Sequence, residues 1–237
     1  MIGQRFNHLP NVVKNLLIIN GLFFLAKATL ISKGINLDKW FALHQFQSQD
    51  FMPHQLVTHM FMHGNLSHLL FNMLSLWIFG KTLENVWGQK RFLTYYIITG
   101  LGAALIYTSY MQFQIADLAQ TNPEYMDLAK KGMFNIYDEN SKKLSSLVNT
   151  PMLGASGAVY GLLLAFGMLF PNSVLMLLFP PIPIKAKYLV IGLALIALFS
   201  GISNVPGDNI AHFAHLGGMI IGVILLKYWK NNGDIYY

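Results

Sequence analysis

Two residues, Ser156 and His215, are of the types that carry out nucleophilic catalysis, and both lie in long apolar segments. Polar side chains are costly inside a bilayer, so each is a candidate for function. A histidine close to a serine accepts the hydroxyl proton while the serine oxygen attacks a carbonyl carbon. His212 precedes His215 by three residues, so spacing alone leaves either histidine as the base.

The surroundings of Ser156 suit a nucleophile. It stands in the run Gly154-Ala155-Ser156-Gly157, which follows Pro151. Proline is common at the first position of a helix, and the first helical turn leaves backbone N–H groups without partners. We therefore expect a helix that starts at Pro151 and N–H donors near Ser156 that stabilise an oxyanion. Runs of small residues also occur in membrane helices purely as packing sites, which is the alternative.

A serine–histidine pair requires two helices in close contact, which small residues four positions apart permit. Such series occur in both segments: Gly157, Gly161 and Ala165 in one, and Ala214, Gly218 and Gly222 in the other. We expect these two series to face each other. Tyr160 follows Ser156 by one turn, where its ring either packs against the histidine or fills the core.

A second group of polar residues lies upstream. His68 and Asn72 are four residues apart, so they share one face of a helix. Both can donate to an oxyanion, or they can hydrogen-bond between helices. His59 and His63 have the spacing of zinc-binding helices, but no acidic residue lies between them and the chain has no cysteine. We expect no metal and no cofactor, and assign these histidines to hydrogen bonding near the membrane surface.

The composition indicates which elements position these residues. The chain has 237 residues, of which 54% are hydrophobic and 11% are charged, against about 25% charged in soluble domains. A bilayer span takes about 20 mostly apolar residues. Six segments fit: 12–31, 66–82, 92–113, 151–170, 188–205 and 210–229. This predicts an all-α polytopic membrane protein with a single domain over residues 1–237.

Charge predicts the orientation of these segments. When the six spans are threaded through a bilayer, most Lys and Arg residues fall on the side of the N-terminus, which places both termini in the cytoplasm. The net charge of +6 comes without a dense basic run, so nucleic acid is not an expected partner. A signal peptide is the alternative for the first segment, but Lys27 in the triplet Ala26-Lys27-Ala28 disfavours cleavage there.

Two long stretches lie outside the expected spans. Residues 32–55 contain an amphipathic run, 37–43, which suits the membrane interface. Residues 114–150 are polar and mixed in charge, with Pro123 and Gly132 as helix breakers. We expect a long, solvated and partly mobile outer loop there, with short helices or a functional lid as alternatives.

Three stretches together resemble the signature motifs of the rhomboid family of intramembrane serine proteases. They are Thr58–Asn72 in the second expected span and the loop before it, Gly154–Gly161 in the fourth, and Ala214–Gly218 followed by Gly222 in the sixth. Gly80, Glu84 and Gly88 and the run Pro181–Lys187 also resemble connections of that family. The likeness covers residues 51–222 apart from the long loop 114–150.

The resemblance implies a six-transmembrane-helix, rhomboid-like bundle with a Ser–His dyad that lacks an aspartate. Ser156 is the implied nucleophile and His215 the implied base, with Tyr160 stacked on its ring. His68, Asn72 and the backbone N–H of Ser156 form the implied oxyanion hole.

The remaining implied roles are supportive. Gly154 and Gly157 make room beside the dyad, Gly161, Gly218 and Gly222 pack the helices, and Glu84 braces the cytoplasmic end. The implied substrates are single-span membrane proteins, cut within or near their transmembrane segment, and the expected location is the bacterial inner membrane. This sequence departs from many bacterial members in its first outer loop, where Lys39-Trp40 is the nearest match to their Trp-Arg pair.

Two other classes of function fit parts of the sequence. A catalytically inactive relative that binds membrane proteins would keep the bundle, but it would not need both members of the dyad. A small transporter that relays protons through intramembrane histidines would need buried acids as partners. Only Glu84 lies near a span, so the protease hypothesis accounts for more of the residues.

Overall fold

The computed structural model describes residues 9–177, 180–203 and 209–233, and most of these residues are helical. The elements before the long central helix are α1 (Asn11–Ile31), α2 (Leu37–Phe41), α3 (Gln55–Thr58), η1 (His59–Phe61), α4 (Leu66–Ser75), η2 (Leu76–Gly80) and α5 (Lys81–Trp87). Those that follow are α6 (Gln89–Thr121), α7 (Pro123–Lys130), α8 (Glu139–Asn149), α9 (Ser156–Leu169), β1 (Val174–Met176), β2 (Pro183–Lys185), α10 (Ala186–Ile202) and α11 (Asn209–Asn231).

Three helices of the described chain are long and apolar enough to cross a bilayer: α1, α6 and the part of α11 from His212 onwards. Helices α9 and α10 are equally apolar but shorter. The second expected span is one continuous helical path in three parts, because the π-helical turn η2 separates α4 from α5. The structure thus has helices at all six expected positions, three of which meet the length and hydropathy of a full span.

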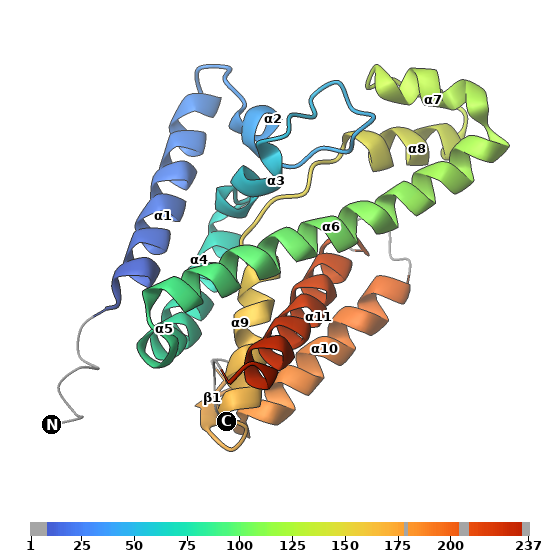
Figure 1. Ribbon diagram of the computed structural model, residues 1–237. Helices are drawn as coiled ribbons and strands as arrows, with labels where there is room; N and C mark the ends of the chain where they lie inside the picture. The colour runs from blue at the N-terminus through green and yellow to red at the C-terminus, as the bar shows by residue number, and fades with distance from the viewer. Residues whose placement is uncertain (1–8, 178–179, 204–208, 234–237) are drawn as a thin grey trace, which may run out of the picture.

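Helix α9 occupies the centre of the bundle, between α1 at one edge and α10 at the other, while α6 runs diagonally across (Figure 1). Its Gly, Ala and Leu residues are largely buried against α6 and α11. A helix that is apolar all round and rich in small residues can be enclosed by neighbours on every side. The element that carries Ser156 is therefore the most enclosed helix of the bundle.

The expected helix start at Pro151 is wrong. Helix α9 begins at Ser156, and the residues before it run as an extended segment in which Met152 forms an antiparallel β-bridge with Leu43. The extended backbone places Gly154 at a φ of 122°, a conformation that favours glycine. Ser156 is consequently the first residue of its helix instead of a residue within the second turn.

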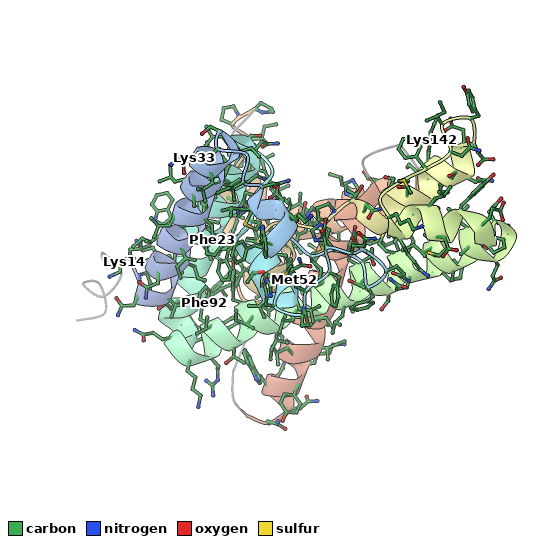
Figure 2. The ribbon with its side chains drawn as sticks, turned by 90° about the horizontal axis from the view of Figure 1, so that it is seen from above. Lys14, Phe23, Lys33, Met52, Phe92 and Lys142 are labelled. Carbon is green, nitrogen blue, oxygen red and sulfur yellow. The ribbon has the colours of Figure 1, made fainter. Side chains whose placement is uncertain are left out.

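The expected outer loop 114–150 is also replaced by ordered helices, which was the alternative. Helix α6 continues to Thr121, eight residues beyond the expected end of its span, and α7 and α8 pack against each other. They enclose a small core of Ile115, Ala129, Leu144 and Val148. Seen from above, this hairpin extends away from α1, as the positions of Lys142 and Lys14 show (Figure 2).

The end of the bundle at which α1 begins is fastened by Glu84, which is buried. Its two carboxylate oxygens accept hydrogen bonds from the backbone N–H groups of Val12 (3.0 Å) and Val13 (2.8 Å) at the start of α1. Helix N-termini favour negative charge because their first N–H groups lack intrahelical acceptors. Glu84 of α5 thus caps α1 across the bundle.

Candidate active site

The structure brings Ser156 and His215 into direct contact. His215 Nε2 lies 2.9 Å from Ser156 Oγ, although the two residues are 59 positions apart in the chain. Ser156 is the first residue of α9, and His215 lies in the first half of α11. At this distance a neutral imidazole can accept the serine proton directly.

The histidine ring is held on its flank by Tyr160. The two rings are stacked, with centroids 4.0 Å apart and planes inclined by 6°. Among the described residues, no hydrogen-bond partner reaches His215 Nδ1, which is buried. In this part of the chain, stacking and packing orient the imidazole where a carboxylate does so in a Ser–His–Asp triad.

His212, the other candidate for the base, does not make the contact with Ser156. Its ring lies at 90° to that of His215, with centroids 6.1 Å apart. Three residues on a helix are about 60° apart around the axis and about 4.5 Å apart along it, so the two rings share a side of α11 but lie at different levels, and the level of His215 is the one that meets Ser156. The choice that spacing left open is decided by the crossing of α9 and α11.

His68 approaches the nucleophile from α4. A Cβ atom on Gly154 would lie 2.8 Å from His68 Nε2, so only a glycine leaves room for the ring there. Gly154 is two residues before Ser156, so the Nε2 edge of His68 faces the backbone beside the nucleophile. The His68 ring and the first N–H groups of α9 therefore converge on one region, as the donors of an oxyanion hole do.

Asn72 lies one turn further along α4 and is buried. Its Nδ2 donates to the carbonyl oxygen of His68 (2.9 Å), which leaves a second N–H of the same amide. Both residues border a cavity of about 670 Å³ that also contains the dyad. Its other lining residues are Phe71, Ser75, Thr150, Pro151, Met152, Leu153, Val159, Leu163, Leu193 and Ala214, together with Tyr160. This volume is in the range of ligand-binding pockets.

The segment that leads into Ser156 is fixed by the stretch of chain between α1 and α4. Leu43 and Met152 exchange two backbone hydrogen bonds of 2.8 Å, and Gly154 N–H donates to the carbonyl oxygen of His59 (2.9 Å). These bonds satisfy backbone groups that would otherwise be buried without partners. Leu43 and His59, which lie far upstream in the chain, thereby fix the position at which α9 begins.

Gln55, which the sequence did not single out, organises that loop. Its side chain is fully buried. Gln55 Oε1 accepts hydrogen bonds from the N–H groups of His44 (3.2 Å) and Met52 (3.1 Å). Gln55 Nε2 donates to the carbonyl oxygens of Asp50 (2.7 Å) and Lys39 (3.2 Å). A buried amide with these partners, and with the Trp40 carbonyl oxygen at 3.5 Å, replaces regular secondary structure in holding the loop. A lone glutamine in a polar stretch gives no sequence signal of this role.

The histidines upstream of His68 have separate structural roles. His59 Nδ1 lies 2.9 Å from the carbonyl oxygen of Gln55, and the His63 ring packs edge-on against His68 at 5.1 Å. Burial lowers the pKa of His59 to about 4, and burial followed by the nearby His68 lowers the pKa of His63 to about 4. Within the described residues, no three His, Asp or Glu side chains are placed to hold a metal ion.

The glycines expected to join α9 to α11 do so only in part. Gly157 and Gly218 are in direct backbone contact, so that a Cβ on Gly218 would overlap the Gly157 carbonyl group. Gly161 instead faces Thr99 of α6, while Gly222 faces both Tyr95 of α6 and Leu164 of α9. Tyr95 also donates a hydrogen bond to the carbonyl oxygen of Gly161 (3.0 Å). The two glycine series therefore meet each other at Gly157 and Gly218, whereas Gly161 and Gly222 also make room for side chains of α6.

Comparison with known proteins adds an independent finding. A family profile described as "Rhomboid domain" matches residues 50–230. RHOMBOID-like protein 12, mitochondrial, of Arabidopsis thaliana is 31% identical over 174 residues, which cover 72% of this chain and 45% of that protein. Rhomboid protease AarA of Providencia stuartii is 27% identical over 70% of this chain and 52% of its own length. Rhomboid protein 1, mitochondrial, of Saccharomyces cerevisiae is 30% identical over 69% of this chain and 38% of its own. The chain thus spans about half, or less, of the length of these three relatives.

Proposed function

Because the chain belongs to the rhomboid family, which its match over residues 50–230 establishes, we propose that it is an intramembrane serine endopeptidase. One of the relatives is named a rhomboid protease, which supports the assignment by analogy. The observation that carries the proposal is the 2.9 Å separation of Ser156 Oγ and His215 Nε2 inside a cavity between membrane helices.

The reaction that we propose is peptide-bond hydrolysis through an acyl-enzyme. Ser156 Oγ attacks the scissile carbonyl carbon while His215 Nε2 takes up the hydroxyl proton, which it then gives to the leaving amine nitrogen. A water molecule, deprotonated by the same nitrogen, attacks the resulting ester and releases the second product. The developing negative charge is stabilised by His68, Asn72 and the Ser156 N–H.

The proposed substrates are single-span membrane proteins, cut within or near their transmembrane segment. The cavity is lined mainly by apolar side chains, with polar groups gathered around the dyad. A peptide bond in a helix is shielded by its own turns, so the cut segment has to be locally extended to reach Ser156. The apolar lining of the cavity suits such a segment as it leaves the lipid.

The chain is an integral membrane protein, for which we propose six spans, formed by α1, the path from α4 to α5, α6, α9, α10 and α11. The basic residues at the starts of α6 and α10 and at the end of α11 indicate one common face for those ends. The expected bacterial inner membrane is not supported by the relatives, since two of the three are named mitochondrial.

The test is cleavage of a generic single-span substrate by the purified protein in liposomes, with Ser156→Ala as the matched control. We expect cleavage by the wild type and none by the variant, because the nucleophilic oxygen is removed. Equal cleavage by both would refute the assignment of Ser156. Binding of the substrate without cleavage by the wild type would favour an inactive relative.

A further inference from the structure

Lys27 is a charged residue in the last third of an apolar helix, α1, four residues before its end, and the reaction proposed above assigns it no role. Its ammonium group forms an ion pair with Asp38 at 2.7 Å, and its side chain is only 16% exposed. The same nitrogen donates a hydrogen bond to the carbonyl oxygen of His63 at 2.9 Å. A largely buried ammonium group is costly unless it is paired, so the partners of Lys27 indicate what it does.

The carbonyl that Lys27 binds belongs to the peptide unit between His63 and Gly64. The N–H of that same unit, carried by Gly64, donates to Nδ1 of His68 over 3.5 Å, a long hydrogen bond. A trans peptide is planar, so its carbonyl and N–H point in opposite directions. Fixing the oxygen at Lys27 therefore fixes the direction of the N–H towards His68, and the cation also polarises the amide into a better donor.

This hydrogen bond determines where His68 carries its proton. In a neutral imidazole one nitrogen is a donor and the other an acceptor. An Nδ1 that accepts from Gly64 leaves the proton on Nε2, the nitrogen that faces Gly154 next to Ser156. The opposite tautomer would present a lone pair to the developing oxyanion and repel it.

We propose that Lys27, held by Asp38, is a positioning residue that sets the tautomer of His68 through the His63–Gly64 peptide. The inference rests on the proposed function, because the Nε2–H donor serves the oxyanion of that reaction. The path runs from α1 through one backbone peptide to α4 and crosses no other side chain. Asn65 caps α4 by accepting from His68 N–H (2.8 Å), which keeps the ring at a fixed height beside that peptide.

The direct test is the tautomer of His68, read by nitrogen NMR of protein labelled with ¹⁵N-histidine, at a pH well above the ordinary histidine pKa. Loss of a signal in His68→Gln identifies the resonances. We expect Nε2–H in the wild type, and a shift towards Nδ1–H in Lys27→Met. Lys27→Arg, which keeps a cationic donor, should retain the wild-type tautomer, and so should Lys14→Met, which removes an exposed lysine of the same helix.

Kinetics give a second reading that a purely structural role would not produce. Removing one oxyanion donor from a serine hydrolase lowers kcat by roughly 10²–10³, so a partial shift of tautomer in Lys27→Met should lower kcat by roughly tenfold to a hundredfold. KM should change little, because the donor acts mainly in the transition state. Loss through general destabilisation would lower the unfolding temperature and would not be restored by Lys27→Arg.

The outcomes separate this inference from the proposed function. The tautomer of His68 is measured without a substrate. If the wild type cleaves nothing, the proposed protease activity is refuted, but the NMR measurement still decides whether Lys27 sets the tautomer. An Nδ1–H tautomer in the wild type overturns the inference even if no Lys27 variant folds. An unchanged tautomer in a folded Lys27→Met, which has no donor at this position, also overturns it.

Discussion

At the scale of single residues, one interatomic distance distinguishes the two candidates for the proposed general base. His215 and His212 are both in α11, but only His215 places a ring nitrogen 2.9 Å from Ser156 Oγ. We expect His215→Ala to lower kcat/KM by about 10³-fold or more. His212→Ala should keep most of the activity, measured with the same substrate and with the unfolding temperature as a check on folding. The reverse pattern would assign the base to His212.

Tyr160 orients that base through its ring face, which touches the imidazole at 4.0 Å. Tyr160→Phe keeps the stacked ring and should leave kcat within about twofold, whereas Tyr160→Ala removes the support and should lower kcat roughly tenfold or more. The comparison of the two variants in one cleavage assay separates the ring from the hydroxyl group. A large loss in Tyr160→Phe would show that the hydroxyl group, and not stacking, matters.

At the scale of elements, the contact between α9 and α11 rests on the absence of a side chain at Gly218. Its missing Cβ leaves the space that the Gly157 carbonyl group occupies. Gly218→Ala should therefore separate the helices, cost about 1–3 kcal/mol of stability, and move His215 away from Ser156. Gly192→Ala in α10 is the matched control, since nothing lies within 4 Å of its added methyl. Unfolding temperature and cleavage rate should both fall in the first variant alone.

His59, in the stretch of chain between α1 and α4, should make the free energy of unfolding depend on pH. His59 has a folded pKa of about 4 because of burial, against about 6.5 when unfolded. The unfolded chain therefore binds more protons between these values, so stability is full above pH 6.5 and is lost as pH falls towards 4. His59 alone should cost about 2 kcal/mol between about pH 7.5 and about pH 5.

The measurement for this element is the thermal unfolding of wild type and His59→Gln at the two pH values. The neutral amide cannot take up a proton, so the variant should show a smaller drop on acidification, with the remaining drop due to His63 and other groups. An equal drop in both proteins would mean that His59 is not the group that titrates.

At the scale of the whole molecule, the α7–α8 hairpin has its own small core, which is distinct from the large core around α9 and meets the cluster of Met152 and Ala214 only through Leu147. Leu144→Ala should cost the hairpin about 2–5 kcal/mol of local stability, because a fully buried leucine is truncated. We expect faster limited proteolysis within residues 122–150 and cleavage of a generic substrate within about twofold of wild type. Lys143→Ala, at an exposed neighbour, is the control. A large loss of cleavage would show that the hairpin is coupled to the site.

The sequence alone determined the class of the protein and predicted the residues of the proposed site. Composition and long apolar segments indicated a helical membrane protein. Lipid offers no hydrogen-bond partners, so segments that cross it consist of apolar residues and form helices, which pair their own backbone groups. The resemblance carried by the three motifs is confirmed by the family match. Helical periodicity is local, so the existence of α1, α6 and α11 could be predicted with their approximate bounds.

The tertiary structure decided how those residues meet. Three features depend on segments that are distant in the chain: the contact of His215, and not of His212, with Ser156; the start of α9 at Ser156; and the contact of α6 with Gly161. The role of Gln55 and the link from Lys27 to His68 pass through irregular backbone, whose hydrogen-bond partners follow no sequence period. Residue types and periodic spacing fix which faces are polar, but only the packed crossing of helices fixes which polar groups come within 3 Å of each other.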